Sequence, residues 1–461
     1  MAITGTVIAM LAATEQALDH RIATEQHDNR LPSLVAAVVR DGVPVWTGGR
    51  GRVAGTTPTE DTQYRIGSIT KTFVGVMIMR LRDEGMLNLS DPLRTHLRGT
   101  SFGDRTIGEL VSHAAGITAE PDGDWWERSD GKPWADLAGA TGLETIRTRA
   151  GRRFHYSNLG FAALGEVVAR LRQTDWFTAV RDEILVPLGM NRTTMPPTAP
   201  HATGWAVHPW ADVLLPEPAH DARGMAPAGQ LWSTSTDLGK WAAFLGGSCG
   251  DVLSADTLTE MREPVVVEDG NAWVEGYGIA LQLLRDRGRR LAGHTGSMPG
   301  FLATVWADPD VATGAVAMAN TTTGAGISSL VADLLDIVAT HEPKQPTEWT
   351  PLAEFDHDLL ALTGQWYWGP AAYGMRLAAD NWLELSPLKG GSRYRFRPEL
   401  DGTWTGLDGY FAAERLRVIR RADGSVSHLD LNTFVLTRTP YDPSVPIPGG
   451  LDEQGWRGQP G

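Results

Sequence analysis

Two hydrophobic patterns divide the chain, and the change from one to the other falls near residue 342. Up to that point, apolar residues recur at helical spacing in several segments, and short apolar runs typical of strands lie near both ends of the region. Helices are predicted over residues 6–22, 68–85, 106–114, 161–171, 176–185, 234–245 and 326–341, and strands over 34–39, 43–46, 276–285, 289–294, 301–307 and 313–320. The pattern therefore predicts one sheet whose strands come from opposite parts of the region, with a helical insertion between them.

The pattern changes to short strands after this region. The segment that begins Glu342-Pro343 breaks the helical periodicity and predicts a linker over residues 342–352. Beyond it, runs rich in aromatic and branched residues recur at intervals of about 8–12 residues, separated by turn pairs such as Asp401-Gly402. We therefore expect a larger domain over 1–341, a small all-β barrel or meander over 353–441, and a flexible tail rich in Pro and Gly over 442–461.

Composition limits the classes of partner. The 461 residues are 42% hydrophobic and 21% charged, which suits a globular protein with a large core. The net charge of −14 and the lack of a long basic run argue against nucleic acid and against an anionic membrane surface. One cysteine, Cys249, excludes an intrachain disulfide. No Lys or Arg precedes the apolar run Val7–Ala13, and no run approaches the ~18 residues of a membrane span, so a cytoplasmic location is expected.

The clearest chemical pattern is Ser68-Ile69-Thr70-Lys71 at the start of a predicted helix. Residues three apart on a helix share a face at about 5–6 Å, so we expect the Lys71 amine to lie against the Ser68 hydroxyl. Gly67 would let the chain turn sharply into the helix, where unpaired N–H groups favour a developing negative charge. A buried amine with a lowered pKa is a base that can activate a serine. Ser-x-x-Lys also occurs by chance as an N-cap serine with a solvated lysine, so this motif indicates catalysis only in combination with other motifs.

Tyr156-Ser157-Asn158 precedes another predicted helix. A tyrosine at such a junction can carry a proton if cations hold it near its anionic form, and Asn158 can bond both Lys71 and a substrate amide. Taken alone, the motif is equally a turn with a surface tyrosine and an N-cap asparagine.

His294-Thr295-Gly296-Ser297 follows a predicted strand. Gly296 would let the backbone of a substrate approach closely. Taken alone, the motif is equally a histidine at the end of a strand followed by a turn. The remaining histidines do not have zinc-ligand spacing, so neither a metal nor another cofactor is expected.

The three motifs, Ser68-x-x-Lys71, Tyr156-x-Asn158 and His294-Thr295-Gly296, stand in this order with separations of 88 and 138 residues. Together they resemble the signature motifs of the serine β-lactamase and penicillin-binding-protein superfamily. The form with Tyr-x-Asn is similar to class C β-lactamases, DD-carboxypeptidases of the streptomycete type and their esterase relatives. The resemblance covers residues 15–340 and includes the segments 110–117, 187–190, 227–234 and 277–279. It implies an α/β (α+β) fold, with an antiparallel sheet flanked by helices, a helical subdomain, and the site in the cleft between them.

The resemblance also implies a role for each residue. Ser68 matches the nucleophile that forms an acyl-enzyme, and Lys71 matches its partner base. Tyr156 matches the residue that passes a proton to the leaving group, and Asn158 matches the residue that orients Lys71 and the substrate amide. The backbone N–H groups of Ser68 and Ser297 would form the oxyanion hole, with Thr295 and Gly296 beside them as substrate-binding residues.

Two features depart from a plain β-lactamase. Class C enzymes carry a lysine where this chain has His294, and a histidine is charged only in part near neutral pH, which disfavours substrates held by a carboxylate. The C-terminal β region resembles the lipocalin-like domain of penicillin-binding-protein-type thioesterases, which close nonribosomal peptides into rings. Its tryptophans Trp366, Trp368, Trp382 and Trp404 are expected to form a barrel core rather than a ligand site.

The sequence therefore predicts a serine hydrolase or acyltransferase that acts on ester, thioester or amide substrates, peptide-like and with a preference for D-residues. The substrate is a small molecule or a peptide, and it could be bound to a carrier protein. Three alternatives stay open: a stand-alone peptide cyclase that uses an internal amine as acceptor, a β-lactamase or DD-carboxypeptidase, and a non-catalytic binding protein. Substrate identity, stereochemical preference, the acyl acceptor, the role of the barrel and the oligomeric state are not determined by the sequence.

Overall fold

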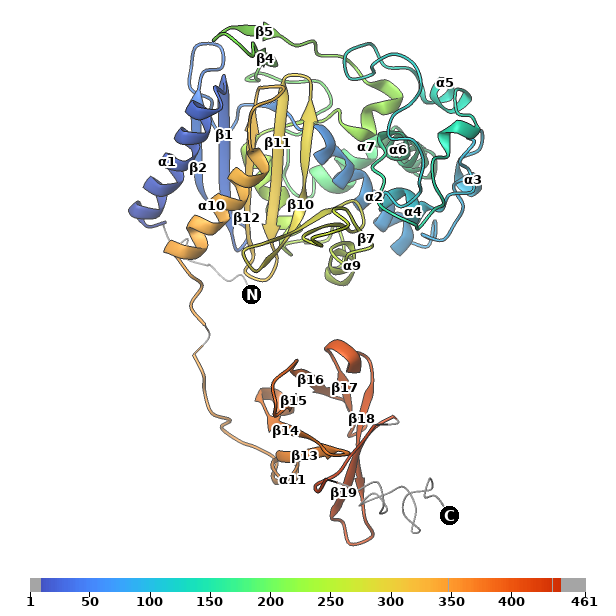
Figure 1. Cartoon of the computed structure of the whole chain (residues 1–461), viewed down its shortest axis with the longest axis vertical. Coiled ribbons are helices and arrows are strands. Elements are labelled where there is room, and N and C mark those ends of the chain that lie inside the picture. Colours follow the sequence, from blue (N-terminus) through green and yellow to red (C-terminus); the bar gives the residue numbers. More distant parts are fainter. Residues whose placement is uncertain (1–9, 347, 433, 441–461) are drawn as a thin grey trace. The chain divides into compact units, whose positions relative to one another are not determined.

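The structure is a computed structural model that describes residues 10–346, 348–432 and 434–440. The chain divides between Gln345 and Pro346 into two compact units (Figure 1). The first contains a large sheet with helices, and the second consists mainly of short strands.

An eight-stranded antiparallel sheet forms the centre of the first unit, in the order β2-β1-β12-β11-β10-β9-β8-β7. The strands are β1 (Ser33–Arg40), β2 (Val43–Gly51), β7 (Val266–Val267), β8 (Glu275–Tyr277), β9 (Gln282–Asp286), β10 (Arg289–Met298), β11 (Phe301–Asp308) and β12 (Thr313–Ala319). β1 pairs with β12 from Leu34↔Ala319 to Arg40↔Thr313. The two ends of this region thus meet within one sheet, which confirms the predicted split sheet.

Helices cover both faces of the sheet, and the alternation of side chains along β1 explains why this strand is apolar throughout. Leu34, Ala36 and Val38 pack in one core with α1 (Ala12–Asp28) and α10 (Ile327–His341). The intervening residues pack in a second core, on the side of α2 (Thr70–Asp83) and α8 (Ser235–Leu245). Because successive side chains of a strand point to opposite faces, a strand buried on both faces cannot alternate with polar residues. Figure 1 shows α1 and α10 together on one side of the sheet.

The central helix α2 is buried on almost every side, including every residue from Thr70 to Met79. A helix that is enclosed all round belongs to a core rather than to a surface layer. α6 (Asn158–Arg172) packs beside it. The other α-helices of the unit are α3 (Leu93–His96), α4 (Ile107–Val111), α5 (Trp134–Gly139), α7 (Trp176–Val180, followed by a π turn over Arg181–Leu185) and α9 (Ala255–Met261). Among the residues that the structure describes, no helix has the length and apolar character that a membrane crossing requires.

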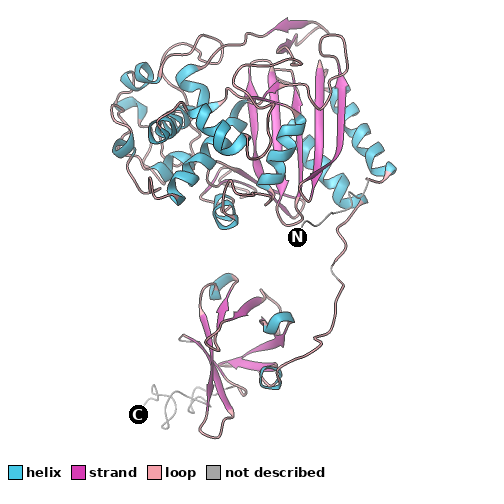
Figure 2. Cartoon of the chain, turned by 180° about the vertical axis from the view of Figure 1, so that it is seen from behind, coloured by secondary structure: helices cyan, strands magenta, loops and turns pink. Residues whose placement is uncertain are grey.

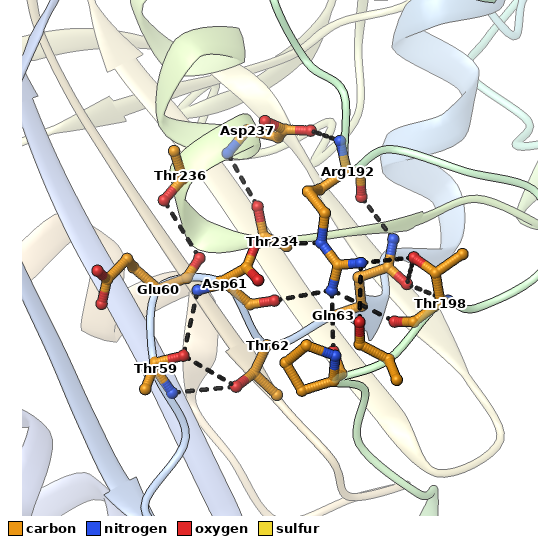
Figure 3. Close-up of polar contacts among 12 residues, drawn as sticks. Thr59, Glu60, Asp61, Thr62, Gln63, Arg192, Thr198, Thr234, Thr236 and Asp237 are labelled. Atoms are coloured by element: carbon orange, nitrogen blue, oxygen red, sulfur yellow. Dashed lines mark hydrogen bonds and ion pairs between the residues drawn. The ribbon is translucent and has the colours of Figure 1, made fainter.

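One of the two short ribbons in this unit, formed by Tyr64–Arg65 and Trp232–Ser233, holds the segment that leads to Ser68 together with one arginine. β3 (Tyr64–Arg65) pairs with β6 (Trp232–Ser233), and β4 (Trp205–Val207) pairs with β5 (Leu214–Pro216). Figure 3 shows how the Arg192 guanidinium donates to Asp61 and Thr198, while its backbone N–H donates to Asp237 Oδ2 at 2.7 Å. The chain before β3 is therefore tied to the beginning of α8.

The second unit is a nearly closed barrel of eight antiparallel strands in sequence order (Figure 2). The strands are β13 (Gly364–Trp368), β14 (Ala371–Leu377), β15 (Leu383–Pro387), β16 (Tyr394–Pro398), β17 (Trp404–Gly406), β18 (Arg415–Arg420), β19 (Val426–Leu431) and β20 (Phe434–Leu436), with a short helix α11 (His357–Leu360) before them. Tyr367 and Thr437 exchange backbone hydrogen bonds of 2.7 and 2.9 Å, which bring the first strand to the last. Trp366 and Trp404 are buried as expected, but Trp368 is 46% exposed and therefore does not belong to the barrel core.

Several predicted boundaries were wrong. The first helix begins at Ala12 rather than residue 6 and continues to Asp28; residues 1–9 lie outside the described residues, as does the predicted tail at 442–461. The strand predicted over 276–285 is two strands, β8 and β9, because residues 278–281 form a turn in which the Gly278 N–H donates to the Leu281 carbonyl. β10 does not stop at 294 but continues to Met298 through the histidine motif.

We expect Trp241→Ala to destabilise the first unit by about 3–5 kcal/mol, the usual cost of removing a fully buried aromatic side chain. Trp241 has no exposed surface and stacks between Phe73 and Phe244 at ring-centroid distances of 4.0 and 4.6 Å. Its indole N–H also donates to Thr72 Oγ1. Urea denaturation measures the change. Trp210→Ala is the control, because Trp210 is 90% exposed, and equal losses in the two variants would contradict this account.

Candidate active site

Ser68 lies in a tight turn directly before α2. The turn is a 3₁₀ helix over Gly67–Ile69, so α2 itself begins two residues after the serine. Gly67 has φ of +52°, and a Cβ at this position would lie 2.5 Å from the backbone N of Ser297. Only glycine meets both conditions without strain. The turn leaves Ser68 partly exposed in an otherwise buried segment.

Lys71 is completely buried and has three hydrogen-bond acceptors. Its Nζ donates to Ser68 Oγ at 2.9 Å, to Asn158 Oδ1 at 2.6 Å and to the Ala228 carbonyl at 2.6 Å. Ala228 ends a 3₁₀ helix over Arg223–Ala228, and no feature of the sequence pointed to its carbonyl. Burial lowers the pKa of Lys71 to about 7, although the charges of Glu120 and Glu127 oppose the shift. Near neutral pH this amine therefore exists in both its charged and its neutral form.

Asn158 is the first residue of α6, and Ser157 caps that helix by accepting from the Gly160 N–H at 3.0 Å. The Asn158 Nδ2 donates to Glu120 Oε1 at 2.6 Å. Glu120 lies in the loop between α4 and α5, far from the three motifs in sequence. Sequence reasoning missed it, because an isolated glutamate in a loop carries no pattern.

Tyr156 lies against the Ser68 and Lys71 pair. The Lys71 Nζ is 4.9 Å from the centroid of the Tyr156 ring. Burial raises the pKa of Tyr156, and the carboxylates around it raise it further. Cations therefore do not hold this tyrosine near its anionic form, and burial favours the neutral phenol.

The His113 ring packs against the Tyr156 ring. The two rings are 4.1 Å apart, and His113 Nδ1 accepts from the Ser157 N–H at 3.0 Å. The hydrogen of the neutral imidazole must therefore be on Nε2. Burial and the nearby Lys71 charge hold the pKa of His113 well below its usual value, so the ring is neutral. No feature of the sequence pointed to the contact between His113 and the tyrosine.

His294 is also neutral. It is buried in β10, where Nδ1 contacts the Thr295 carbonyl and the Tyr277 hydroxyl lies 3.2 Å from Nε2. Burial lowers the pKa of His294 to about 3, assisted by the charge of Lys71. The partial charge that an exposed histidine has near neutral pH is thus absent, and this position offers a substrate no positive charge.

The backbone of β10 lies directly on the Ser68 turn. A Cβ at Gly296 would lie 1.9 Å from the Ile66 carbonyl oxygen and 3.2 Å from the Ser68 backbone N. Thr295 is half-buried, its N–H donates to Gln282 Oε1 at 2.8 Å, and Ser297 is exposed. All the site residues predicted from the sequence therefore lie around one point, at the junction of the sheet, α2 and α6. Among the described residues, no group of three or more His, Cys, Asp or Glu is placed to hold a metal ion.

Comparison with known families agrees with this geometry. A family model described as Beta-lactamase matches residues 15–340. A model described as Domain of unknown function (DUF7586) matches residues 355–438, so the lipocalin-like character of the barrel stays a prediction.

Two curated relatives are similar to part of this chain. Beta-lactamase-like protein 2 of Dictyostelium discoideum is 29% identical over 296 residues, which cover 59% of this chain and 52% of that protein. Penicillin-binding protein 4 of Amycolatopsis lactamdurans is 28% identical over 300 residues, which cover 60% of this chain and 77% of that protein. The chain thus spans about half the length of the Dictyostelium protein.

Solved structures share the fold. The octameric penicillin-binding protein homologue from Pyrococcus abyssi has a TM-score of 0.63 at 22% identity and covers 92% of this chain and 99% of its own. SurE has a TM-score of 0.60 at 22% identity and covers 93% of this chain and 99% of its own. A D-stereospecific amidohydrolase from Streptomyces sp. has a TM-score of 0.58 at 26% identity and covers 72% and 99%.

We expect Gly296→Ala to lower kcat/KM on a chromogenic ester by about a hundredfold, the scale of loss when a reacting group moves by about 1 Å. The added methyl would overlap the Ile66 carbonyl and push β10 away from Ser68. Gly139→Ala in α5 is the matched control, since no atom lies within 4 Å of its added Cβ. Wild-type rates in the Gly296 variant would show that this contact is not needed.

Proposed function

The chain belongs to the beta-lactamase family of serine hydrolases, and from this premise we propose that it transfers acyl groups through a covalent ester on Ser68. The observation that carries the proposal is the fully buried Lys71 amine, 2.9 Å from Ser68 Oγ and with a pKa of about 7. An amine with this pKa is half neutral near pH 7 and can take the serine proton.

Acylation begins when neutral Lys71 accepts the proton of Ser68 and Ser68 Oγ attacks the carbonyl carbon of the substrate. The oxygen of that carbonyl becomes negative, and the backbone N–H groups of Ser68 and Ser297 are proposed to stabilise it; one such donor contributes about 10²–10³ in rate. Tyr156 then gives its phenol proton to the leaving group and regains a proton from the Lys71 ammonium. The products are the acyl-Ser68 ester and the free leaving group.

Deacylation reverses these steps with a new acceptor. Water or an amine attacks the ester carbonyl while losing a proton to the Tyr156 and Lys71 pair, and Ser68 Oγ takes that proton back as it leaves. Nothing in the chemistry of the pair distinguishes water from an amine, so the acceptor is decided by what the substrate brings to the site.

The substrate we propose is a neutral or amine-bearing peptide-like ester, thioester or amide with a D-residue at the acyl end. The neutral His294 supports this class, because a substrate carboxylate would find no cation there. Solved relatives support the stereochemistry: one is a D-stereospecific amidohydrolase, and another is SurE in complex with D-Leu.

The test uses a peptidyl thioester with a D-residue at the acyl end and a free amine at the other, incubated with the purified full-length protein and read by mass. We expect the thiol to be released and the peptide mass to appear on Ser68 as an intermediate. A linear peptide acid identifies water as the acceptor. A product whose mass is one water lower than that of the linear acid identifies ring closure by the internal amine. Ser68→Ala should give neither product nor adduct, and normal turnover by that variant would refute the mechanism.

The value of kcat/KM should fall as the pH is lowered, with a midpoint near pH 7. Burial lowers the pKa of Lys71 to about 7, so kcat/KM should rise with pH through that value and level off above it, as the amine loses its proton. His113 and His294 stay neutral across this range and should add no second step. A midpoint near 4 to 5, typical of a carboxylate, would identify a different base.

A further inference from the structure

Glu120 belongs to the loop between α4 and α5 in the helical insertion, and Asn158 connects it to the catalytic lysine. Its two carboxylate oxygens accept from two different donors: Oε1 from Asn158 Nδ2 at 2.6 Å, and Oε2 from the Trp126 indole N–H at 2.7 Å. These two donors screen the oxygens although the residue as a whole is exposed. Loss of hydration raises the pKa of Glu120, and the two hydrogen bonds oppose the shift. Two accepting oxygens are the pattern of an ionised carboxylate.

Hydrogen bonds also hold the backbone of the two residues before Glu120. The Ala119 carbonyl accepts from the Asn158 N–H at 2.8 Å, and the Thr118 carbonyl accepts from Ser157 Oγ at 2.7 Å. Segment 118–120 is therefore attached to the first residues of α6, and Glu120 reaches Asn158 from a fixed position.

The contact with Glu120 determines which end of the Asn158 amide faces Lys71. A carboxylate only accepts hydrogen bonds, and an ammonium only donates them. With the NH₂ group toward Glu120, the amide oxygen faces Lys71 Nζ at 2.6 Å, and both pairs are satisfied. Rotating the amide by 180° would oppose two donors at Lys71 and two acceptors at Glu120. A neutral glutamine in place of Glu120 would remove this selection, because it can present either a donor or an acceptor.

We propose that Glu120 is a positioning residue for the reaction at Ser68: it locks the Asn158 amide oxygen onto Lys71, and its negative charge raises the pH above which Lys71 accepts the serine proton. This inference rests on the proposed function. Glu120 acts on Lys71 through the hydrogen bond to Asn158 and through the electrostatic effect of its own negative charge. No contact between Glu120 and the substrate is required.

The other groups around Lys71 allow charge and hydrogen bonding to be separated. From the insertion loop, Glu127 also raises the pKa of Lys71, but its Oε2 accepts from the Trp125 indole N–H and no bond joins it to Asn158. The titratable groups that face the lysine from outside this loop are neutral. They are His113, His294 and Tyr156. Glu127 therefore acts on Lys71 by charge alone, whereas Glu120 combines charge with the amide lock.

The test measures how fast Ser68 is labelled by an alkyl fluorophosphonate between pH 5 and 9, with the adduct located by mass. This probe needs no knowledge of the natural substrate: Ser68 Oγ bonds to phosphorus, fluoride leaves, and the serine proton passes to Lys71. We expect Glu120→Gln to move the acid limb of the labelling rate down by about 0.5–1 pH unit, because a lost negative charge destabilises the ammonium. The rate on the plateau should also fall, by about tenfold, because the amide is no longer locked.

Glu127→Gln is the matched control, since it removes a charge of the same sign from the same loop. It should move the acid limb downward but leave the plateau rate unchanged. In an Asn158→Ala background, Glu120→Gln should cause no further loss on the plateau, which is the signature of an effect transmitted through Asn158. Thermal melting of each variant establishes that the fold is retained.

An acid limb that stays in place or moves upward in Glu120→Gln would overturn the charge effect. An unchanged plateau, or an equal additional loss in the Asn158→Ala background, would overturn the amide lock. If the wild-type protein is not labelled at Ser68 at any pH, the proposed function itself fails, and this result is distinct from the other two.

Discussion

The burial of the Lys71 amine is the constraint on which the rest of the catalytic unit depends. An amine that is shut off from water must find acceptors for its hydrogens, and it holds its charge less readily than it does in solution. The three acceptors come from three segments that are remote in sequence: Ser68 before α2, Asn158 at the start of α6, and Ala228 at the end of a 3₁₀ helix. The basicity of Lys71 is therefore a property of the way in which these segments pack together.

The same packing explains the glycines of the site. The turn at Gly67 and the strand at Gly296 meet through their backbones, and a Cβ on either residue would overlap main-chain atoms of the other segment. This contact needs a rigid strand on one side and a buried helix start on the other. The sheet supplies the strand because β10 is paired with β11 along the whole motif, from Ala292 to Met298. The core around α2 supplies the helix start.

The polar groups around Lys71 are arranged so that few of them carry charge. His113 and His294 are neutral because they are buried beside a potential cation, and Tyr156 is neutral because it is buried beside carboxylates. Among these groups, positive charge is thus confined to Lys71, and the two carboxylates that raise its pKa, Glu120 and Glu127, come from the insertion loop. The buried, neutral His294 adds no cation at the third motif.

The sequence by itself predicted the residues that meet at the candidate site and the general plan of the fold. Ser68 and Lys71 are one helical turn apart, so local geometry alone brings them together, and the apolar runs at both ends of the first unit predicted the split sheet. Only the tertiary structure decided the ionisation states and the supporting contacts. The neutral forms of Tyr156 and His294 depend on burial by distant segments, and Glu120 and the Ala228 carbonyl join the site from loops that have no motif. Burial and long-range hydrogen bonds are set by how segments far apart in the chain meet, and spacing along the sequence does not record them.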